Sequence, residues 1–373
     1  MKFTISSSAF YSRLTAASKV LAAKNSMPIL ECFLLDIKNG HVSITASDGE
    51  KYFVTKVPLV DSDNNAQFCV TAKQLMDSIK ELAEQPLTLE YNPDTHEVRG
   101  THQTGVFSIM GLDASPYPTQ QAVAQDATSL TISSDILLNG INRCLFATAN
   151  DEIRLVMTGI YMDIHENDIT FAGTDGRKLV RYINRDVQPG IATGFILPKK
   201  VAAIVKNVLA KGVDVAISFD NEKAHIQTEA FDLYFRMIEG HYPNYNSVIP
   251  TNNPYQATVD RNSLIGALKR VSVFCNQSSA LMKLHLEGGQ MKITGQDNDY
   301  ATSVEENLLC DYSDAPISIG FSCHLMIEIA SVLDSEQITI QLADPSRPGI
   351  IIPAEQPENE ETLMLLMPMM LND

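Results

Sequence analysis

The chain has 373 residues, of which 28 are Lys or Arg and 45 are Asp or Glu, so its formal net charge is −17. This acidity argues against a protein whose whole surface is covered by nucleic acid. It leaves room for a local basic stripe, because charges are screened over about 8 Å at physiological salt. No apolar run approaches the roughly 18 residues that a membrane span needs, and the first residues, MKFTISSSAF, lack the apolar core of a signal peptide.

The cysteines point to a reducing compartment, and we expect a cytoplasmic protein that does not enter a membrane. They form no Cys-x-x-Cys pair and most lie beside apolar residues, as small buried side chains do. The six positions are Cys32, Cys69, Cys144, Cys275, Cys310 and Cys323.

The first third of the chain predicts a strand, a helix, a run of strands, a second helix and a hairpin. Over residues 5–21, apolar residues at helical spacing follow a strand, and serines before them supply a helix N-cap. Residues 33–59 alternate between apolar and polar and are broken by Asn-Gly and Asp-Gly, which indicates antiparallel strands joined by tight turns. A second helix is expected over 70–82 and further strands over 87–112, before the Pro-containing segment 114–129.

The same order of elements is predicted twice more, and the two halves of each third also resemble each other in pattern. In the second third the segments are 132–148, 159–183, 197–209 and 215–240, followed by the Pro-rich segment 241–256. In the last third they are 259–274, 284–307 and 321–333.

These similarities amount to a threefold internal repeat. Asp48, Asp175 and Asp297 occupy matching positions 127 and 122 residues apart, and each precedes the closing leucine of the second helix by 34, 34 and 36 residues. Such a period is too long for a solenoid, whose units run to about 20–50 residues. We expect an α+β protein of three similar domains, 1–124, 125–252 and 253–373.

A search for an active site finds none. The repeated aspartates could serve a metal-dependent hydrolase, but Asp followed by Gly or Asn is the usual composition of a turn, and the repeat places the three in separate domains. The chain has no His-x-x-x-His, no cysteine pair at ligand spacing, no glycine-rich phosphate loop and no Gly-x-Ser-x-Gly elbow. We expect neither a catalytic residue nor a cofactor or metal.

Basic residues, scarce overall, gather on the predicted helices. Lys73 and Lys80 are seven residues apart and so share a helix face. Helices on one side of a curved sheet would pool such charges into a track that binds phosphates without reading sequence. The alternatives are an ordinary solvated helix face and a protein-interaction scaffold that has no DNA role.

The last residues, TLMLLMPMMLND, combine an apolar strand pattern with methionines, which suit a groove that accepts several peptides. Together with the threefold repeat, TDGRKLV, GHYPNYNSVIP and MPMML resemble the bacterial sliding clamp, the beta subunit of DNA polymerase III, over the whole chain. The resemblance implies a non-catalytic, head-to-tail homodimeric ring with strands outside and helices lining the hole. It also implies sequence-independent binding of double-stranded DNA, and docking of the polymerase catalytic subunit, the clamp loader and other clamp-binding-motif proteins.

The resemblance further implies a peptide pocket between the second and third domains, on which the turn, the preceding strand, the linker and the last strand converge. Ser247 and Met370 stand where arginine is commoner in the family, which alters the polar rim of the pocket. The pocket residues carried over are Met157, Thr174, Gly176, Arg177, Lys178, Leu179, Pro243, Ser247, Val248, Leu365, Leu366, Met367, Pro368, Met369 and Met370.

Two other sites are carried over from the family. The joint of the ring would bring Phe107 and Ile109, on the last strand of the first domain, against Val273 and Phe274, on the first helix of the third. Internal packing of Val273 and Phe274 is the alternative. The lysines expected to touch DNA are Lys24, Lys73, Lys80, Lys199 and Lys200.

Overall fold

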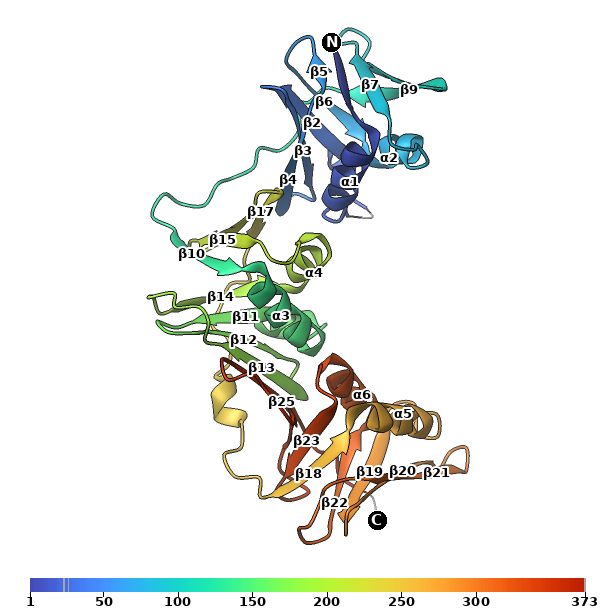
Figure 1. The fold of residues 1–373 in the computed structure, drawn as a ribbon, viewed down its shortest axis with the longest axis vertical. Coiled ribbons are helices and arrows are strands. Elements are labelled where there is room, and N and C mark those ends of the chain that lie inside the picture. The colour runs from blue at the N-terminus through green and yellow to red at the C-terminus, as the bar shows by residue number, and fades with distance from the viewer. Residues whose placement is uncertain (23, 26, 372–373) are drawn as a thin grey trace. The chain divides into compact units, whose positions relative to one another are not determined.

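A computed structural model describes residues 1–22, 24–25 and 27–371 and shows the predicted order of elements three times over (Figure 1). The first repeat contains β1 (Lys2–Ser6), α1 (Ser7–Ser18), β2 (Cys32–Lys38), β3 (His41–Ser47), β4 (Lys51–Pro58), β5 (Asp61–Ser62), β6 (Ala66–Thr71), α2 (Ala72–Ile79), β7 (Pro86–Tyr91), β8 (Glu97–His102) and β9 (Gly105–Leu112). The second contains β10 (Thr128–Ser133), α3 (Ser134–Cys144), β11 (Gly159–Ile164), β12 (Ile169–Thr174), β13 (Lys178–Asn184), β14 (Thr193–Pro198), α4 (Lys199–Val208), β15 (Asp214–Phe219), β16 (Lys223–Gln227) and β17 (Phe231–Arg236). The third contains β18 (Tyr255–Asp260), α5 (Arg261–Ser272), β19 (Leu281–Glu287), β20 (Gln290–Asp297), β21 (Thr302–Leu309), β22 (Ile317–Ser322), α6 (Cys323–Val332), β23 (Gln337–Leu342), β24 (Gly349–Pro353) and β25 (Glu360–Leu366).

The helices begin where the sequence predicts. Ser6 caps α1 by accepting a hydrogen bond from the backbone N–H of Ala9 at 3.2 Å, and Asp260 caps α5 by accepting one from Ser263 at 2.7 Å. These side chains satisfy N–H groups that have no partner inside the helix. No helix in the described ranges is both long and apolar enough to cross a membrane.

The tight turns are also confirmed. Asn39 and Gly40 both have positive φ, 54° and 73°, as the turn between β2 and β3 requires. The Asp48 and Asp175 carboxylates each accept two backbone N–H groups of their own turn, and Asp297 accepts that of Asp299. The three carboxylates therefore shape turns, as their Asp-Gly and Asp-Asn sequences indicate. Among the described residues there is no cluster of three or more His, Cys, Asp or Glu side chains suited to a metal.

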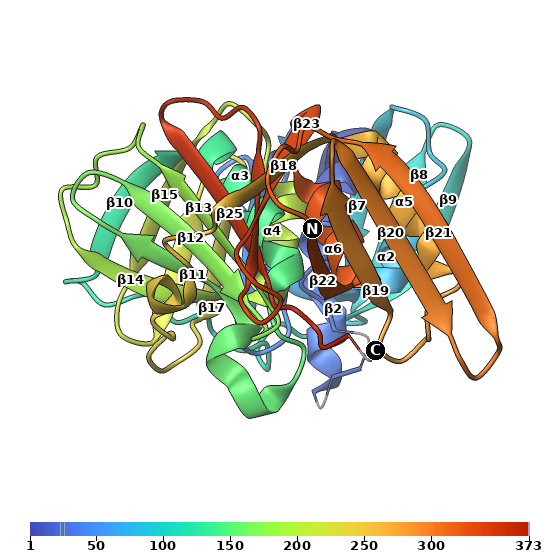
Figure 2. The same ribbon diagram turned by 90° about the horizontal axis from the view of Figure 1, so that it is seen from below.

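Each repeat builds two four-stranded antiparallel sheets, and each sheet joins three strands of one half-repeat to the opening strand of the other. In the first repeat the sheets run β6-β2-β3-β4 and β1-β7-β8-β9, and the other repeats follow the same plan. This exchange of opening strands ties the halves together. Figure 2 shows β19, β20 and β21 side by side, and α5 packs against β20 and β21.

The described residues form two compact units, and the central third of the sequence contributes to both. One unit comprises Met1–Asp135 with Asn207–Met237, and the other comprises Ile136–Lys206 with Ile238–Asp373. In the first unit β4 pairs with β17, and Phe53 stacks on Phe231 with ring centroids 5.0 Å apart. In the second unit β13 pairs with β25 over seven residues of each strand. Continuous strand ladders therefore connect consecutive repeats, and the boundaries 1–124, 125–252 and 253–373 stay a prediction.

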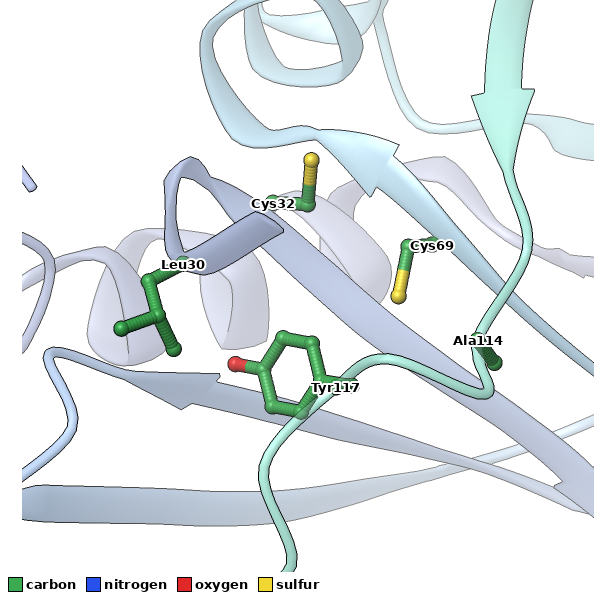
Figure 3. Close-up of a cluster of buried hydrophobic side chains, with 5 residues drawn as sticks. All are labelled: Leu30, Cys32, Cys69, Ala114 and Tyr117. Carbon is green, nitrogen blue, oxygen red and sulfur yellow. The ribbon is translucent and has the colours of Figure 1, made fainter. Parts of the chain in front are cut away.

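The segment after β9 is held to the first unit by a small apolar cluster (Figure 3). Tyr117 and Ala114 of this segment pack with Leu30, Cys32 and Cys69, and all five side chains are buried. The segment is thus anchored by burial although it carries no regular structure.

Candidate functional site

The TDG turn between β12 and β13 is held by its own hydrogen bonds. The Asp175 carboxylate accepts the backbone N–H groups of Arg177 and Lys178 at 2.8 and 3.0 Å. The Thr174 hydroxyl donates to the Lys178 carbonyl at 2.7 Å and accepts the Gly176 N–H at 3.1 Å. Thr174 is buried and Gly176 has φ of 84°, so both predicted residues shape the turn, and Arg177 is the side chain that the turn presents to solvent.

The Lys178 side chain, predicted as a pocket residue, points inward and lines neither of the two hollows described below. Its ammonium lies 3.0 Å from the Asp175 carboxylate and 3.0 Å from that of Glu328 on α6, and only 7% of the side chain is exposed. The same ammonium lies 5.7 Å from the centre of the Phe146 ring. Lys178 therefore joins β13 to α6 by a shielded ion pair rather than contacting a ligand.

We expect Lys178→Met to lower the free energy of unfolding by about 2–3 kcal/mol, because it removes one partner of a shielded ion pair. Urea unfolding followed by circular dichroism measures this. The matched control is Lys200→Met, which changes an exposed lysine on α4 and should cost no more than about 0.5 kcal/mol. Equal effects of the two substitutions would contradict the assignment.

The chain after β25 forms one wall of a hollow. The Met367 N–H donates to the Arg177 carbonyl at 2.9 Å, and the Met369 N–H donates to the Gly320 carbonyl on β22 at 2.8 Å. A Cβ atom on Gly320 would lie 2.4 Å from the Met369 carbonyl oxygen, so only glycine permits this approach. We call Met367–Leu371 the tail. The expectation that the last strand runs through Met370 is corrected, because β25 ends at Leu366.

The hollow has a volume of about 530 Å³ and lies between the tail, Arg177 and the third repeat. The Asn276 side chain shapes its far rim by accepting the backbone N–H groups of Ser278 and Ser279, and the Ala280 carbonyl accepts the Cys323 N–H. The lining residues are Arg177, Ser278, Ser279, Ala280, Ser322, His324, Leu325, Met367, Pro368 and Met369.

Four of the ten lining residues were predicted from sequence, and the other six were missed. These six come from the loop before β19, the last residue of β22 and the first turn of α6. Their sequences, QSSAL and FSCHL, carry no signal beyond the polar, small residues typical of a loop and a helix start. Only the pairing of the tail with β22 shows that they face it.

A second hollow of about 350 Å³ also has Arg177 in its lining. The Arg154 guanidinium donates to the Asp175 carbonyl at 2.6 Å and to the Asp151 carboxylate at 2.7 Å, and this hydrogen bond lowers the pKa of Asp151. Sequence reasoning missed these residues. The lining comprises Ala149, Asn150, Asp151, Arg154, Asp175 and Arg177.

The other predicted pocket residues divide into buried and exposed groups. Leu179, Leu365 and Leu366 are buried, the first two in a cluster with Ala172 and Tyr245, so they support the site from below and do not line it. Met157 lies in the 3₁₀ helix Glu152–Thr158, not in the preceding strand as expected. The linker residues Pro243, Ser247 and Val248 line neither hollow, although Val248 and the tail residue Met370 are exposed.

The larger hollow suits a short peptide with apolar side chains. Leu325, Met367, Pro368 and Met369 supply apolar surface, and the three serines supply hydroxyl groups. Arg177 and His324 are its ionisable lining residues, and no carboxylate lines it although the chain is strongly acidic. The arrangement offers recognition surface and no nucleophile paired with a base.

Comparison with known proteins identifies the family. Three family models match consecutive parts of the chain: the N-terminal domain of the DNA polymerase III beta subunit over residues 1–121, its central domain over 131–244 and its C-terminal domain over 246–370. The chain belongs to the DNA polymerase III beta subunit family. The resemblance inferred from the sequence motifs is thereby confirmed.

Relatives of this beta-subunit chain carry the same family name and fold. The Beta sliding clamp of Pseudomonas putida is 25% identical over 376 residues, with both chains covered completely. Among solved structures, a sliding clamp of Pseudomonas aeruginosa bound to griselimycin is 23% identical with a TM-score of 0.94, and one of Bartonella birtlesii bound to griselimycin is 24% identical with a TM-score of 0.92. Both cover all of this chain and of their own. The fold is therefore the three-domain sliding-clamp fold.

The lysines of this beta subunit that are expected to contact DNA differ in solvent exposure and in whether they already have an ion-pair or hydrogen-bond partner. On α2 the Asp77 carboxylate lies 2.5 Å from the Lys73 ammonium and 3.8 Å from that of Lys80, so the predicted basic face of α2 is partly neutralised. Lys199 is half-buried and donates to Asn150 at 2.7 Å, and burial lowers its pKa. Lys24 and Lys200 are exposed, which is the property that a phosphate contact requires.

The residues expected at the ring joint lie on exposed edges of this clamp-fold chain. Val273 is 76% exposed and Phe274 is 37% exposed at the C-terminal end of α5, just beyond the helix, so internal packing of Val273 does not occur. Phe107 and Ile109 lie on β9 and are half-buried, and the Phe107 ring covers Gly100 of the neighbouring strand. From Gly105 to Met110, β9 has β8 as its partner on one side and no strand of the described residues on the other.

Proposed function

We propose that this chain is the sliding clamp of a replicative DNA polymerase, a non-catalytic head-to-tail homodimer that closes into a ring around double-stranded DNA. Weak contacts to phosphates would let the ring slide without reading sequence. The polymerase catalytic subunit, the clamp loader and other clamp-binding-motif proteins would dock by short peptides in the hollow beside Arg177. We infer that it works in the cytoplasm, without a cofactor, as three domains over 1–124, 125–252 and 253–373.

The strand pairing between consecutive repeats is the observation that carries this proposal. In each of the first two repeats, three strands follow the first helix, and the third of them pairs with the last strand of the next repeat. These pairs are β4 with β17 in one unit and β13 with β25 in the other. By the same rule β21 of the third repeat requires the last strand of a following repeat. Within the described residues β21 pairs only with β20. The last strand of the first repeat, β9, is the one among the three last strands that has an edge without such a partner. A second copy supplies both missing partners, which closes a cyclic dimer.

The same rule predicts the register of the joint. Tyr52 faces Tyr234 in one ladder, and Leu179 faces Leu365 in the other. Tyr52 and Leu179 are equivalent, because each is the first residue after its Asp turn that pairs with the preceding strand of the same hairpin. Counting from the matching hairpins places Phe107 of one copy opposite the middle of β21 in the other, next to Val304. Val273 and Phe274 end the helix that packs on β21, so they would cover this ladder.

A topological test separates this function from that of a scaffold without a DNA role. We expect the protein, once placed on circular DNA by the clamp loader of its own organism, to stay bound through gel filtration. It should be lost when a restriction enzyme linearises the same circle. A ring that holds DNA by encirclement slides off an end, whereas a protein bound by its surface stays on either form. Equal retention on the circle and the linear product would refute encirclement.

The peptide-docking part of the proposal is supported by the hollow itself. It is concave, it is lined by apolar and polar residues in equal number, and hydrogen bonds of the tail to Arg177 and Gly320 hold one wall in place. Two clamp relatives are named as bound to griselimycin, which makes that compound a practical probe of the corresponding surface here.

A further inference from the structure

Methionine is concentrated in the tail, so thioether groups form part of the wall of the larger hollow. The tail runs from the end of β25 to the side of β22 (Figure 2), and three of its five residues, Met367, Met369 and Met370, are methionine. Met367 and Met369 line the hollow, whereas Met370 does not. A thioether is apolar and adapts its shape, so it suits a surface that receives apolar side chains.

Solvent reaches these tail methionines. Met370 is 89% exposed and Met367 is 41% exposed, while Met369 is half-buried. Peroxides oxidise exposed methionines in preference to buried ones, so in this part of the chain the tail is where an oxidant reacts first. The four methionines between β18 and the tail are fully buried, namely Met282, Met291, Met326 and Met364.

The tail is anchored by groups other than its thioethers. The backbone N–H groups of Met367 and Met369 donate to carbonyl oxygens of the TDG turn and of β22 at 2.9 and 2.8 Å. A Cβ atom on Gly320 would lie 3.0 Å from Leu371 Cδ2, so the Leu371 side chain also covers β22. Oxidation of a thioether removes none of these contacts. It therefore changes the chemistry of the wall and leaves the wall in place.

We propose that Met367, together with Met369, is a reversible oxidation site at which a peroxide makes the larger hollow unfit for apolar peptides. The thioether sulfur attacks one peroxide oxygen, so an S–O bond forms and the O–O bond breaks. The proton on the transferred oxygen passes to the leaving hydroxide or alkoxide, which gives a sulfoxide and water or an alcohol. The sulfur is oxidised and the peroxide is reduced, and methionine sulfoxide reductases reverse the change.

The loss of docking follows from the polarity of the sulfoxide. Its oxygen accepts hydrogen bonds from water, and an apolar side chain seated against it would displace that water without replacing its hydrogen bonds. The cost falls on binding rather than on folding, because Met367 is already partly exposed in the folded chain. This consequence rests on the proposed docking function, whereas the oxidation itself does not.

Two other exposed methionines are matched controls. Met370 lies in the same tail and is more exposed than Met367, but it does not line the hollow. Met27 is 43% exposed, close to the value for Met367, and lies in the first unit. Both should be oxidised about as readily as Met367, so they separate the effect of position from the effect of exposure.

The test is graded oxidation of the full-length native protein with hydrogen peroxide. Peptide mass spectrometry assigns each added oxygen atom, and calorimetry measures griselimycin affinity. We expect Met27, Met367 and Met370 to be oxidised at least about tenfold faster than Met364, because a buried sulfur reacts only during local opening. Affinity should fall at least about tenfold as Met367 is oxidised, and should return after treatment with methionine sulfoxide reductases. A Met367 that stays unmodified while Met27 reacts would overturn the inference.

Leucine variants assign the effect to the wall, because leucine has a similar volume and no thioether. Each variant is compared with its own untreated sample. Met370→Leu and Met27→Leu should lose affinity on treatment as the native sequence does, whereas the double variant Met367→Leu, Met369→Leu should keep its own untreated affinity. An equal loss in all variants would overturn the inference.

The same experiment distinguishes failure of the inference from failure of the docking function. Absence of griselimycin binding before any treatment would refute docking in this hollow, and the inference with it. Unchanged affinity once Met367 is fully oxidised would refute the inference alone.

Discussion

A chain that ends at Leu366 will fold but bind griselimycin at least about a hundredfold more weakly than the full-length protein, a loss of about 3 kcal/mol. The tail supplies Met367, Pro368 and Met369, which form one side of the larger hollow. β25 stays intact without it, because the β13–β25 ladder ends at Leu366. Isothermal titration calorimetry on both proteins measures the affinity, and circular dichroism checks the fold.

A point substitution gives the same test without shortening the chain. Gly320→Ala would place a Cβ atom 2.4 Å from the Met369 carbonyl oxygen, so the tail must move away from β22 and griselimycin affinity should fall. Gly266→Ala on α5 is the matched control, because its Cβ would meet only the Arg270 guanidinium, at 3.5 Å. Full affinity in the truncated chain would show that the hollow is not the binding site.

Phe107→Asp or Phe274→Asp will convert the proposed dimer to a folded monomer. A carboxylate at either position would have to leave water when the joint forms, and we expect each substitution to weaken dimerisation by about 3 kcal/mol or more, over a hundredfold. Neither side chain is fully buried within its own chain, so the monomer fold should tolerate the change. Light scattering coupled to gel filtration measures the mass across a range of concentrations.

The control for this pair is Val60→Asp, an equally drastic change at a side chain that is 73% exposed and lies on neither β9 nor the end of α5. It should leave the dimer intact. A dimer that survives Phe107→Asp and Phe274→Asp together would refute the joint, even if the DNA-retention result favoured a ring.

The architecture of each repeat was readable from local patterns. Helical spacing of apolar residues, a capping Ser6 or Asp260 and an Asn39-Gly40 turn all act over a few residues, so their structural effect is written in adjacent positions. Because the sequence repeats three times, each of these local patterns occurs three times and supports the same prediction. What local pattern did not reveal is that the opening strand of each half-repeat pairs with the other half.

The site was readable only in part. Arg177, Met367, Pro368 and Met369 line the larger hollow as the family resemblance implied. Lys178 and Leu179 follow Arg177 directly, yet both are buried on opposite faces of β13. Alternation along the strand turns Lys178 toward Glu328 on α6 and Leu179 into the cluster with Tyr245. The hollow's other rim, from Ser278 to Leu325, comes from a distant part of the chain that carries no distinctive motif.

The sequence by itself determined the family, the three-part plan, the elements and the turn role of the repeated aspartates, because each follows from short-range spacing or from motifs that few families share. Only the tertiary structure decided which side chains are accessible, which lysines are already paired and which strand edges are free. Those properties depend on contacts between residues tens to hundreds of positions apart, and a linear pattern does not specify them.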